Sequence, residues 1–250
     1  MSRPPERKIP QIMFTGGTYE WITRVSKKHK QLTDVRLSSG QKDSLDRWAE
    51  IEFVHSTVQL EGSDVSSQLV AAVLENRTLD NTGLRIGALL DSYRSLVSLV
   101  KANGKDTNLT LELLLKLHTV PGAGLRPQTV DQNHRIKSEQ LPILLESALS
   151  WYTVDSFAEL NPVEQSALVL LRLLDIQPFE SENERTALTA ASLFTLRKNL
   201  PPIIVKRELQ SRYHSALDEA SRMNTEPMVQ TIAAAIETSL DEMFEIAGKN

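Results

Sequence analysis

Hydrophobic residues recur every three or four positions along most of the chain, the spacing that places them on one face of an α-helix. The clearest early case runs from Leu45 through Trp48, Ile51 and Val54 to Val58. Further segments with this spacing follow, each bounded by Gly, Pro, Asn or a capping residue (64–74, 84–100, 109–117, 141–152, 163–174, 185–197, 206–223 and 227–246). The pattern therefore predicts an all-α protein.

Two stretches stand out from this regular pattern. Asn161, Pro162 and Glu164 have the order of a capping residue, a first-turn proline and a capping-box glutamate, so a helix is expected to start there. The helix that follows, 163–174, is apolar on almost every side and is expected at the centre of a bundle. The segment 120–133 contains two prolines and two glycines, which predicts a loop or a small hairpin.

Composition narrows the classes of protein. The 250 residues suffice for one large domain, or for one domain with a helical extension. A formal net charge of −4 gives no electrostatic reason to expect nucleic acid as a partner. The chain has no cysteine, which excludes disulfides and thiolate chemistry. No apolar run approaches the ~18 residues of a membrane helix, and the polar start argues against a secretory signal. We therefore expect a cytoplasmic protein with no membrane partner.

Candidate chemistry lies in the polar break between two apolar helices, at 177–188, with the sequence QPFESENERTAL. Read at the same spacing, this segment resembles HPFxxGNGRxxR, the active-site signature of the Fic family. Pro178, Phe179, Asn183 and Arg185 match the signature. The resemblance implies that Asn183 and Arg185 are phosphate-binding candidates and that Pro178 and Phe179 shape the loop.

Other segments extend the resemblance in the order that the family has them. Thr57, Glu61 and Gly62 fit the inhibitory-helix pattern [S/T]xxxE[G/N], and 120–130 stands where the family has its target-docking flap. Paired prolines and then Tyr213 follow the loop. The resemblance implies a Fic/Fido-type helical bundle with a small β-hairpin flap or loop. We expect an N-terminal extension (1–40), a Fic-like domain including the inhibitory-type helix (41–225), and a C-terminal helix packed on it (226–250).

The family transfers a nucleoside monophosphate, usually AMP from ATP, to a target hydroxyl, and several positions that this reaction needs are replaced here. Gln177 stands in place of the general-base His, and a carboxamide has no useful basicity near neutral pH. Ser181 stands in place of the acidic Mg²⁺ ligand and is a poor ligand for a hard cation. Leu188 stands in place of the second Arg, which would leave Glu61 without its family partner.

The two glycines of the signature are replaced by Glu182 and Glu184. Both lose the freedom of glycine at positive φ. Each also adds negative charge to the phosphate cradle, at a cost on the order of 3 kcal/mol for a separation of about 5 Å and a dielectric near 20. Arg185 has an alternative role, since it can pair with Glu182 or Glu184 instead of a phosphate.

These replacements favour a degenerate Fic protein without adenylyltransferase (AMPylation) activity, acting as a binding or regulatory module with a protein target docked at 120–130. No cofactor is expected; ATP and Mg²⁺ would be needed only if the family activity persists. One alternative is an active nucleotidyl- or phosphotransferase that uses Glu180, Glu182 or Glu184. Another is a helical interaction domain whose surface, not the loop, matters. The chain is compatible with a homodimer, and His118 and His55 are expected to be surface or capping residues.

Overall fold

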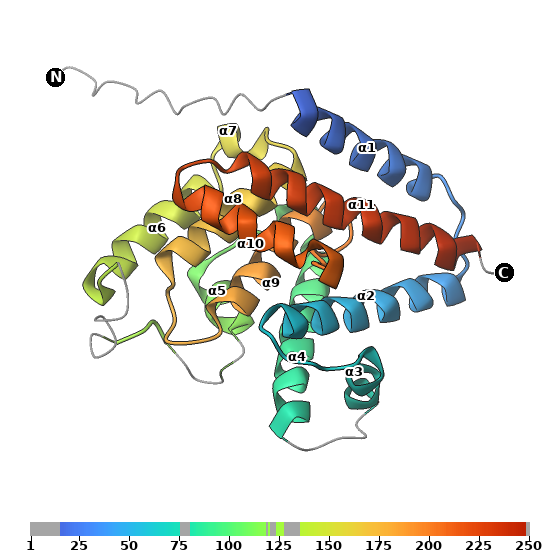
Figure 1. Ribbon diagram of the computed structural model, residues 1–250, viewed down its shortest axis with the longest axis horizontal. Coiled ribbons are helices and arrows are strands. Elements are labelled where there is room, and N and C mark those ends of the chain that lie inside the picture. Colours follow the sequence, from blue (N-terminus) through green and yellow to red (C-terminus); the bar gives the residue numbers. More distant parts are fainter. Residues whose placement is uncertain (1–15, 76–80, 119, 121–123, 128–135, 249–250) are drawn as a thin grey trace.

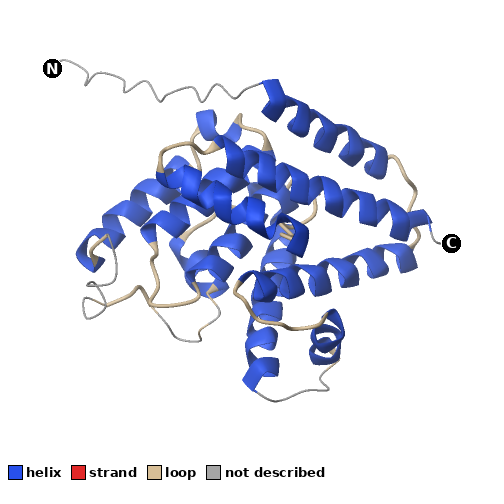
Figure 2. Cartoon of the chain, in the orientation of Figure 1, coloured by secondary structure: helices blue, strands red, loops and turns tan. Residues whose placement is uncertain are grey.

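The structure, a computed structural model, describes residues 16–75, 81–118, 120, 124–127 and 136–248. Within these residues all regular structure is helical and no strand occurs, which confirms the predicted all-α class (Figure 2). The α-helices are α1 (Gly16–Thr33), α2 (Ser39–Leu60), α3 (Ser67–Leu74), α4 (Asn81–Asn103), α5 (Leu111–Leu117), α6 (Leu141–Trp151), α7 (Asp155–Ala158), α8 (Pro162–Ile176), α9 (Asn183–Leu196), α10 (Arg207–Ser221) and α11 (Glu226–Gly248). Short 3₁₀ turns cover Gly104–Asp106 and Ser138–Gln140.

Helices α8 and α9 form the centre of the bundle, and α10 and α11 pack across them (Figure 1). The predicted start of α8 is confirmed, because the Asn161 side chain accepts a hydrogen bond from the Val163 N–H and Glu164 accepts one from the Asn161 N–H. Helix α9 is buried at nearly every position from Arg185 to Thr195. The 177–182 loop therefore joins the two most buried helices of the fold.

Two helices start a few residues later than the apolar spacing predicts. Helix α3 begins at Ser67 and not at 64, because the Ser66 side chain accepts a hydrogen bond from the Leu69 N–H. Helix α5 begins at Leu111 and not at 109, because Thr110 is its cap. Helix α2 extends the Leu45–Val58 pattern back to Ser39, where Ser38 and Gln41 form a capping box. In each case several capping residues lie close together, and the apolar pattern does not choose among them.

The N-terminal part of the chain contributes a helix that the hydrophobic pattern did not predict. Helix α1 lies along α11 (Figure 1), with Val25 and Leu32 buried in the shared core. Ion pairs add to this contact, since Lys28 lies 3.1 Å from Glu237 and 2.7 Å from Asp241. The division into extension, domain and C-terminal helix stays a prediction.

A second, smaller core joins α2, α3 and α4. Phe53 and Tyr93 stack there with ring centroids 4.8 Å apart. This packing fixes the C-terminal end of α2, where Glu61 follows the last helical turn. Among the described helices, none has the length and apolar character needed to cross a membrane.

Candidate functional site

The loop between α8 and α9 is held in shape by Asn183. Its side-chain oxygen accepts a hydrogen bond from the Phe179 N–H at 3.0 Å, and its amide nitrogen donates to the Phe179 carbonyl at 2.9 Å. Phe179 is fully buried beneath the loop, whereas the side chain of Gln177 is exposed at its entrance. The side chain of Asn183, a phosphate-binding candidate in the resemblance, therefore holds the loop closed.

The two glutamates at the glycine positions differ in backbone conformation. Glu182 has φ 57° and ψ 24°, the left-handed region that glycine adopts freely and a β-unbranched residue adopts at a cost. Glu184 lies within the first turn of α9, where any residue fits. The expectation that both positions need the freedom of glycine is wrong for Glu184 and correct for Glu182.

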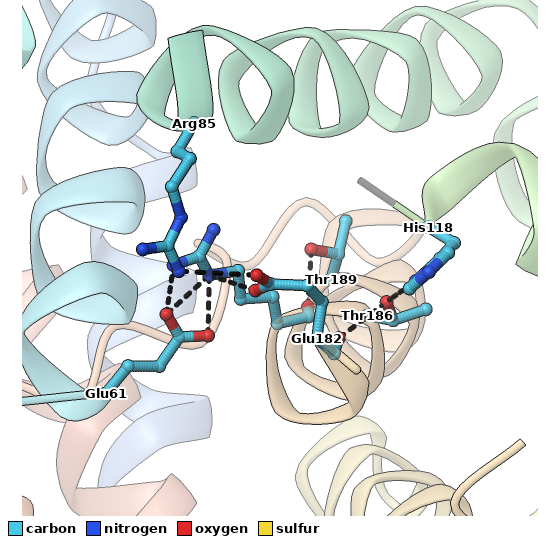
Figure 3. A network of polar contacts seen from close by, with 7 residues as sticks. Glu61, Arg85, His118, Glu182, Thr186 and Thr189 are labelled. Carbon is cyan, nitrogen blue, oxygen red and sulfur yellow. Dashed lines mark hydrogen bonds and ion pairs between the residues drawn. The ribbon is translucent and has the colours of Figure 1, made fainter. Parts of the chain in front are cut away.

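Arg185 is the best-connected charged residue of the site. Its side chain is only 2% exposed, and its Nε lies 2.5 and 2.6 Å from the two carboxylate oxygens of Glu61 and 3.0 Å from Glu182 (Figure 3). Glu61 is therefore not without a partner, contrary to the expectation from Leu188. Arg185, at the position of the first signature arginine, therefore pairs with Glu61, as the resemblance implies for the second arginine. Leu188, at the position of the second, is 1% exposed in the core.

Arg85 of α4 extends this ion-pair network. Its guanidinium lies 3.3 Å from Glu182, so charges of alternating sign run from Arg85 through Glu182 and Arg185 to Glu61 (Figure 3). Burial raises the pKa of Glu61, against the opposing effect of the Arg185 guanidinium. Nothing in the sequence distinguishes Arg85 from other helix-surface arginines, so it was not predicted.

Glu184 lies beside Tyr213 of α10, and its charge also adds to the rise in the pKa of Glu61. Burial raises the pKa of Glu184, and the neighbouring Tyr213 hydroxyl opposes that rise. Burial and the Glu184 carboxyl raise the pKa of Tyr213 well above its usual value. The Tyr213 hydroxyl is buried and forms no hydrogen bond of regular geometry with the described residues. Glu184 therefore belongs to the interior behind the loop and does not pair with Arg185.

His118 lies directly beneath the loop. Its ring stacks on Phe179 with centroids 3.9 Å apart, and its Nδ1 is 3.0 Å from the Thr186 hydroxyl oxygen. The Thr186 hydroxyl donates to the Glu182 carbonyl at 2.9 Å, so Nδ1 carries the proton and donates to Thr186. Burial lowers the pKa of His118. His118 supports the start of α9 and is not a surface residue, whereas His55 lines a separate cleft between α2 and α10.

The segment 120–130 contacts the loop through Arg126, which is 2% exposed. The Arg126 N–H donates to the Pro178 carbonyl at 2.9 Å, and its Nε donates to the Gln177 carbonyl at 2.8 Å. The remaining residues of the predicted flap, 121–123 and 128–130, lie outside the described residues. The sequence gave no reason to single out Arg126.

The acidic residues of the loop differ in their surroundings. Among the described residues, no group of three or more His, Asp and Glu side chains is arranged to hold a metal ion. Glu180 and Ser181 are exposed on the outer side of the loop, while Glu182 is engaged by two arginines.

The known proteins to which the chain is similar include adenylyltransferases named Fic. No family model matches the chain. The chain is 24% identical, over 234 residues, to protein adenylyltransferase Fic of Culex quinquefasciatus, an alignment covering 87% of this chain and 46% of the relative. The chain therefore spans about half the length of the curated relatives it matches.

Solved structures match the fold. Fic-1 of C. elegans superimposes with a TM-score of 0.80 at 19% identity, covering 91% of this chain and 71% of that one. A Fic domain containing signaling protein from Bacteroides thetaiotaomicron superimposes with a TM-score of 0.76 at 19% identity, covering 91% and 96%. The similarity to protein adenylyltransferase Fic, together with the signature loop and the Glu61 helix, supports assignment of the chain to the Fic family, and the solved structures show that it has the all-α Fic fold.

Proposed function

We propose that this chain is a Fic-family protein that does not catalyse adenylyl transfer and that acts as a binding or regulatory module. The observation that carries the proposal is the state of Arg185, the one arginine of the signature that the chain retains. Its guanidinium is buried and paired with the carboxylates of Glu61 and Glu182. A phosphate in the family position would have to displace these carboxylates and then lie beside them.

Electrostatics support this proposal. A carboxylate that stays about 5 Å from a phosphate charge disfavours the complex by on the order of 3 kcal/mol at a dielectric near 20. Arg85 neutralises part of the charge on Glu182, but it is 58% exposed and 3.3 Å away. Tight binding of ATP in the family orientation is therefore not expected.

The residues available for proton transfer and metal binding support the same proposal. Gln177 cannot take a proton from a target hydroxyl near neutral pH, and this step is worth roughly 10²–10⁴-fold in rate. His118 is not placed to replace the missing base, because its ring is buried beneath Phe179 and only 6% of the residue is exposed. With Ser181 at the metal-ligand position, no cofactor is expected.

Two measurements test the proposal. Isothermal titration with ATP and Mg²⁺ or Mn²⁺ should give no binding up to millimolar ATP, and incubation with labelled ATP, alone and with a cell lysate, should give no labelled protein. Transfer of label that is lost in Gln177→Ala would overturn the proposal. Transfer that survives Gln177→Ala but is lost in Glu180→Gln, Glu182→Gln or Glu184→Gln would establish the rearranged nucleotidyl- or phosphotransferase instead.

The partner that we propose is a protein that docks on the 120–130 segment. Support comes from Arg126, whose backbone and side chain both hydrogen-bond to the signature-loop backbone at Pro178 and Gln177. A partner on this segment would therefore be linked to the loop through Arg126. Cross-linking from a photoreactive residue at position 125 or 127, compared with one at the exposed Glu146 of α6, should identify a partner specific to the segment.

A further inference from the structure

A pocket of about 690 Å³ lies between α2, α4, α11 and the segment that follows α9. Leu196 and Arg197, at the C-terminal end of α9, line it, whereas the signature loop precedes the N-terminal end of the same helix. A helix of 14 residues spans roughly 20 Å, so the pocket is separate from the Fic loop. Its floor is apolar, formed by Leu45, Trp48, Val97, Leu200, Pro201 and Met243.

The rim of the pocket is strongly basic. Lys101, Lys105, Arg197 and Lys198 line it, and Asp46 is its only acidic residue among those described. Lys101 pairs with Asp46 at 2.6 Å, but both side chains are more than 60% exposed, so the pair is weak and easily opened. Lys105 and Lys198 form no ion pair with the described residues. This concentration of positive charge occurs in a chain with a net charge of −4.

Helix dipoles account for only part of this charge. The four cations lie at the C-terminal ends of α4 and α9. Each helix end carries about half a negative charge, so the dipoles and Asp46 together leave an excess of about two positive charges. The positive charge that lines the pocket therefore exceeds the charge that would balance the two helix dipoles and Asp46.

Arg197 supplies a fixed charge in the pocket wall. Its guanidinium lies 4.4 Å from the Phe194 ring centroid and donates to Gln165 Oε1 at 3.1 Å and to the Thr107 carbonyl at 3.4 Å. All of these partners are neutral, and its buried Nε–H has no hydrogen-bond acceptor among the described residues. Burial without a carboxylate nearby lowers the pKa of Arg197. Arg197 therefore places a positive charge beside the pocket that no carboxylate among the described residues balances.

We propose that this pocket binds an organic anion, a carboxylate or phosphate joined to an apolar chain or ring. The anionic head would lie among Lys105, Arg197 and Lys198, and the apolar body would cover the floor beside Trp48. A volume of about 690 Å³ falls within the range of roughly 300–1,000 Å³ that is usual for small-molecule sites. The site is independent of the Fic loop and of any activity there.

Trp48 provides the readout, because it lines the pocket. The full chain is titrated with decanoate and decyl phosphate below their critical micelle concentrations, while tryptophan fluorescence is followed. Both ligands are expected to give a saturable change in fluorescence, and the ligand with the lower Kd identifies the preferred head group. Trp48→Phe should remove the change. Decanol, acetate and inorganic phosphate should bind at least tenfold more weakly. Decanol lacks the anionic head, and acetate and inorganic phosphate lack the apolar body.

A pair of double variants separates pocket binding from general charge. Lys105→Ala/Lys198→Ala removes exposed pocket lysines, and Lys42→Ala/Lys116→Ala removes the same charge from exposed positions elsewhere. The first should weaken binding of the anions at least fivefold and the second less than twofold, with circular dichroism unchanged in both. Equal affinity in the two double variants, or no saturable change with either anion, would overturn the proposal.

Discussion

Arg185 and Glu61 lie 124 positions apart in the sequence, yet both carboxylate oxygens of Glu61 lie within 2.6 Å of the Arg185 Nε. The contact joins the end of α2 to the first turn of α9 and places the retained signature arginine in an ion pair that is almost entirely buried. Arg185, a phosphate-binding candidate of the signature, therefore links the smaller core to the central helices α8 and α9.

Replacing Glu61 should destabilise the protein, because the buried Arg185 loses its main counter-charge. Glu61→Gln leaves the buried Arg185 with only Glu182 as a counter-charge, and breaking a buried pair from one side costs about 3–5 kcal/mol. Because Glu182 remains, we expect the free energy of unfolding, measured by urea denaturation, to fall by about 3 kcal/mol. The matched control is Glu50→Gln, on the same helix and paired with the more exposed Arg94, which should cost less than about 1 kcal/mol.

The second arm of the same experiment is a double-mutant cycle. Arg185→Met removes the other charge, and Glu61→Gln/Arg185→Met removes both. The double variant should be more stable than the sum of the single effects predicts, by at least about 1 kcal/mol. Strict additivity would mean that Glu61 and Arg185 are not energetically coupled.

The left-handed backbone at Glu182 gives a separate prediction. Glu182→Gly and Glu182→Gln both remove the charge that pairs with Arg185 and Arg85. Only glycine also relieves the strain of φ 57°, which for a residue with a side chain costs about 1–2 kcal/mol. Glu182→Gly should therefore be more stable than Glu182→Gln by about 1 kcal/mol in thermal and urea unfolding. Equal stability would show that position 182 does not keep this conformation.

The fold can be predicted from the sequence because the apolar spacing and the loop signature agree. The Asn161 cap, the apolar α8 and the 177–188 break all lie where the pattern predicts them. The charge network cannot be predicted in this way, because Arg85 and Glu61 approach Arg185 only through the packing of α2 and α4 against the bundle. Long-range pairs of this kind leave no local spacing in the sequence. Helix α1 was not predicted because most of its residues are polar. Val25 and Leu32 are its two buried apolar residues, too few to give a visible pattern.

The two hydrogen bonds of Asn183 predict how the loop depends on that side chain. Asn183→Ala removes both the acceptor for the Phe179 N–H and the donor to the Phe179 carbonyl. Leaving these partly buried groups unpaired should cost about 1–3 kcal/mol. Asn183→Asp keeps the acceptor and loses the donor, so it should cost less. Hydrogen exchange at residues 179–183 should accelerate in the order wild type, Asn183→Asp, Asn183→Ala, and the reverse order for the two variants would contradict the assigned roles.

The buried His118 predicts a loss of stability in mild acid. Its pKa lies below the usual 6.5 because burial disfavours the charged ring, although Glu182 pulls in the other direction. Below pH 6.5 the unfolded chain therefore takes up a proton that the native protein does not, and the free energy of unfolding falls with pH by up to about 1.4 kcal/mol per unit for one such histidine. The decline should stop once the pH passes below the native pKa.

His29, whose pKa burial also lowers, adds a second contribution of the same sign. Glu164 and Glu184 have raised pKa values and act in the opposite direction, so their stabilising effect is complete below about pH 4.5 and is lost as the pH rises through their native pKa values. Comparison of variants isolates His118. In His118→Gln, whose amide can still donate to Thr186, the slope of unfolding free energy between pH 7 and 5 should be shallower than in the wild type. His29→Gln is the matched control for a histidine outside the loop, and the double variant should lose both contributions. A slope left unchanged by His118→Gln would mean that His118 has the same pKa in the folded and the unfolded chain, and the lowered pKa assigned to the buried ring would be wrong.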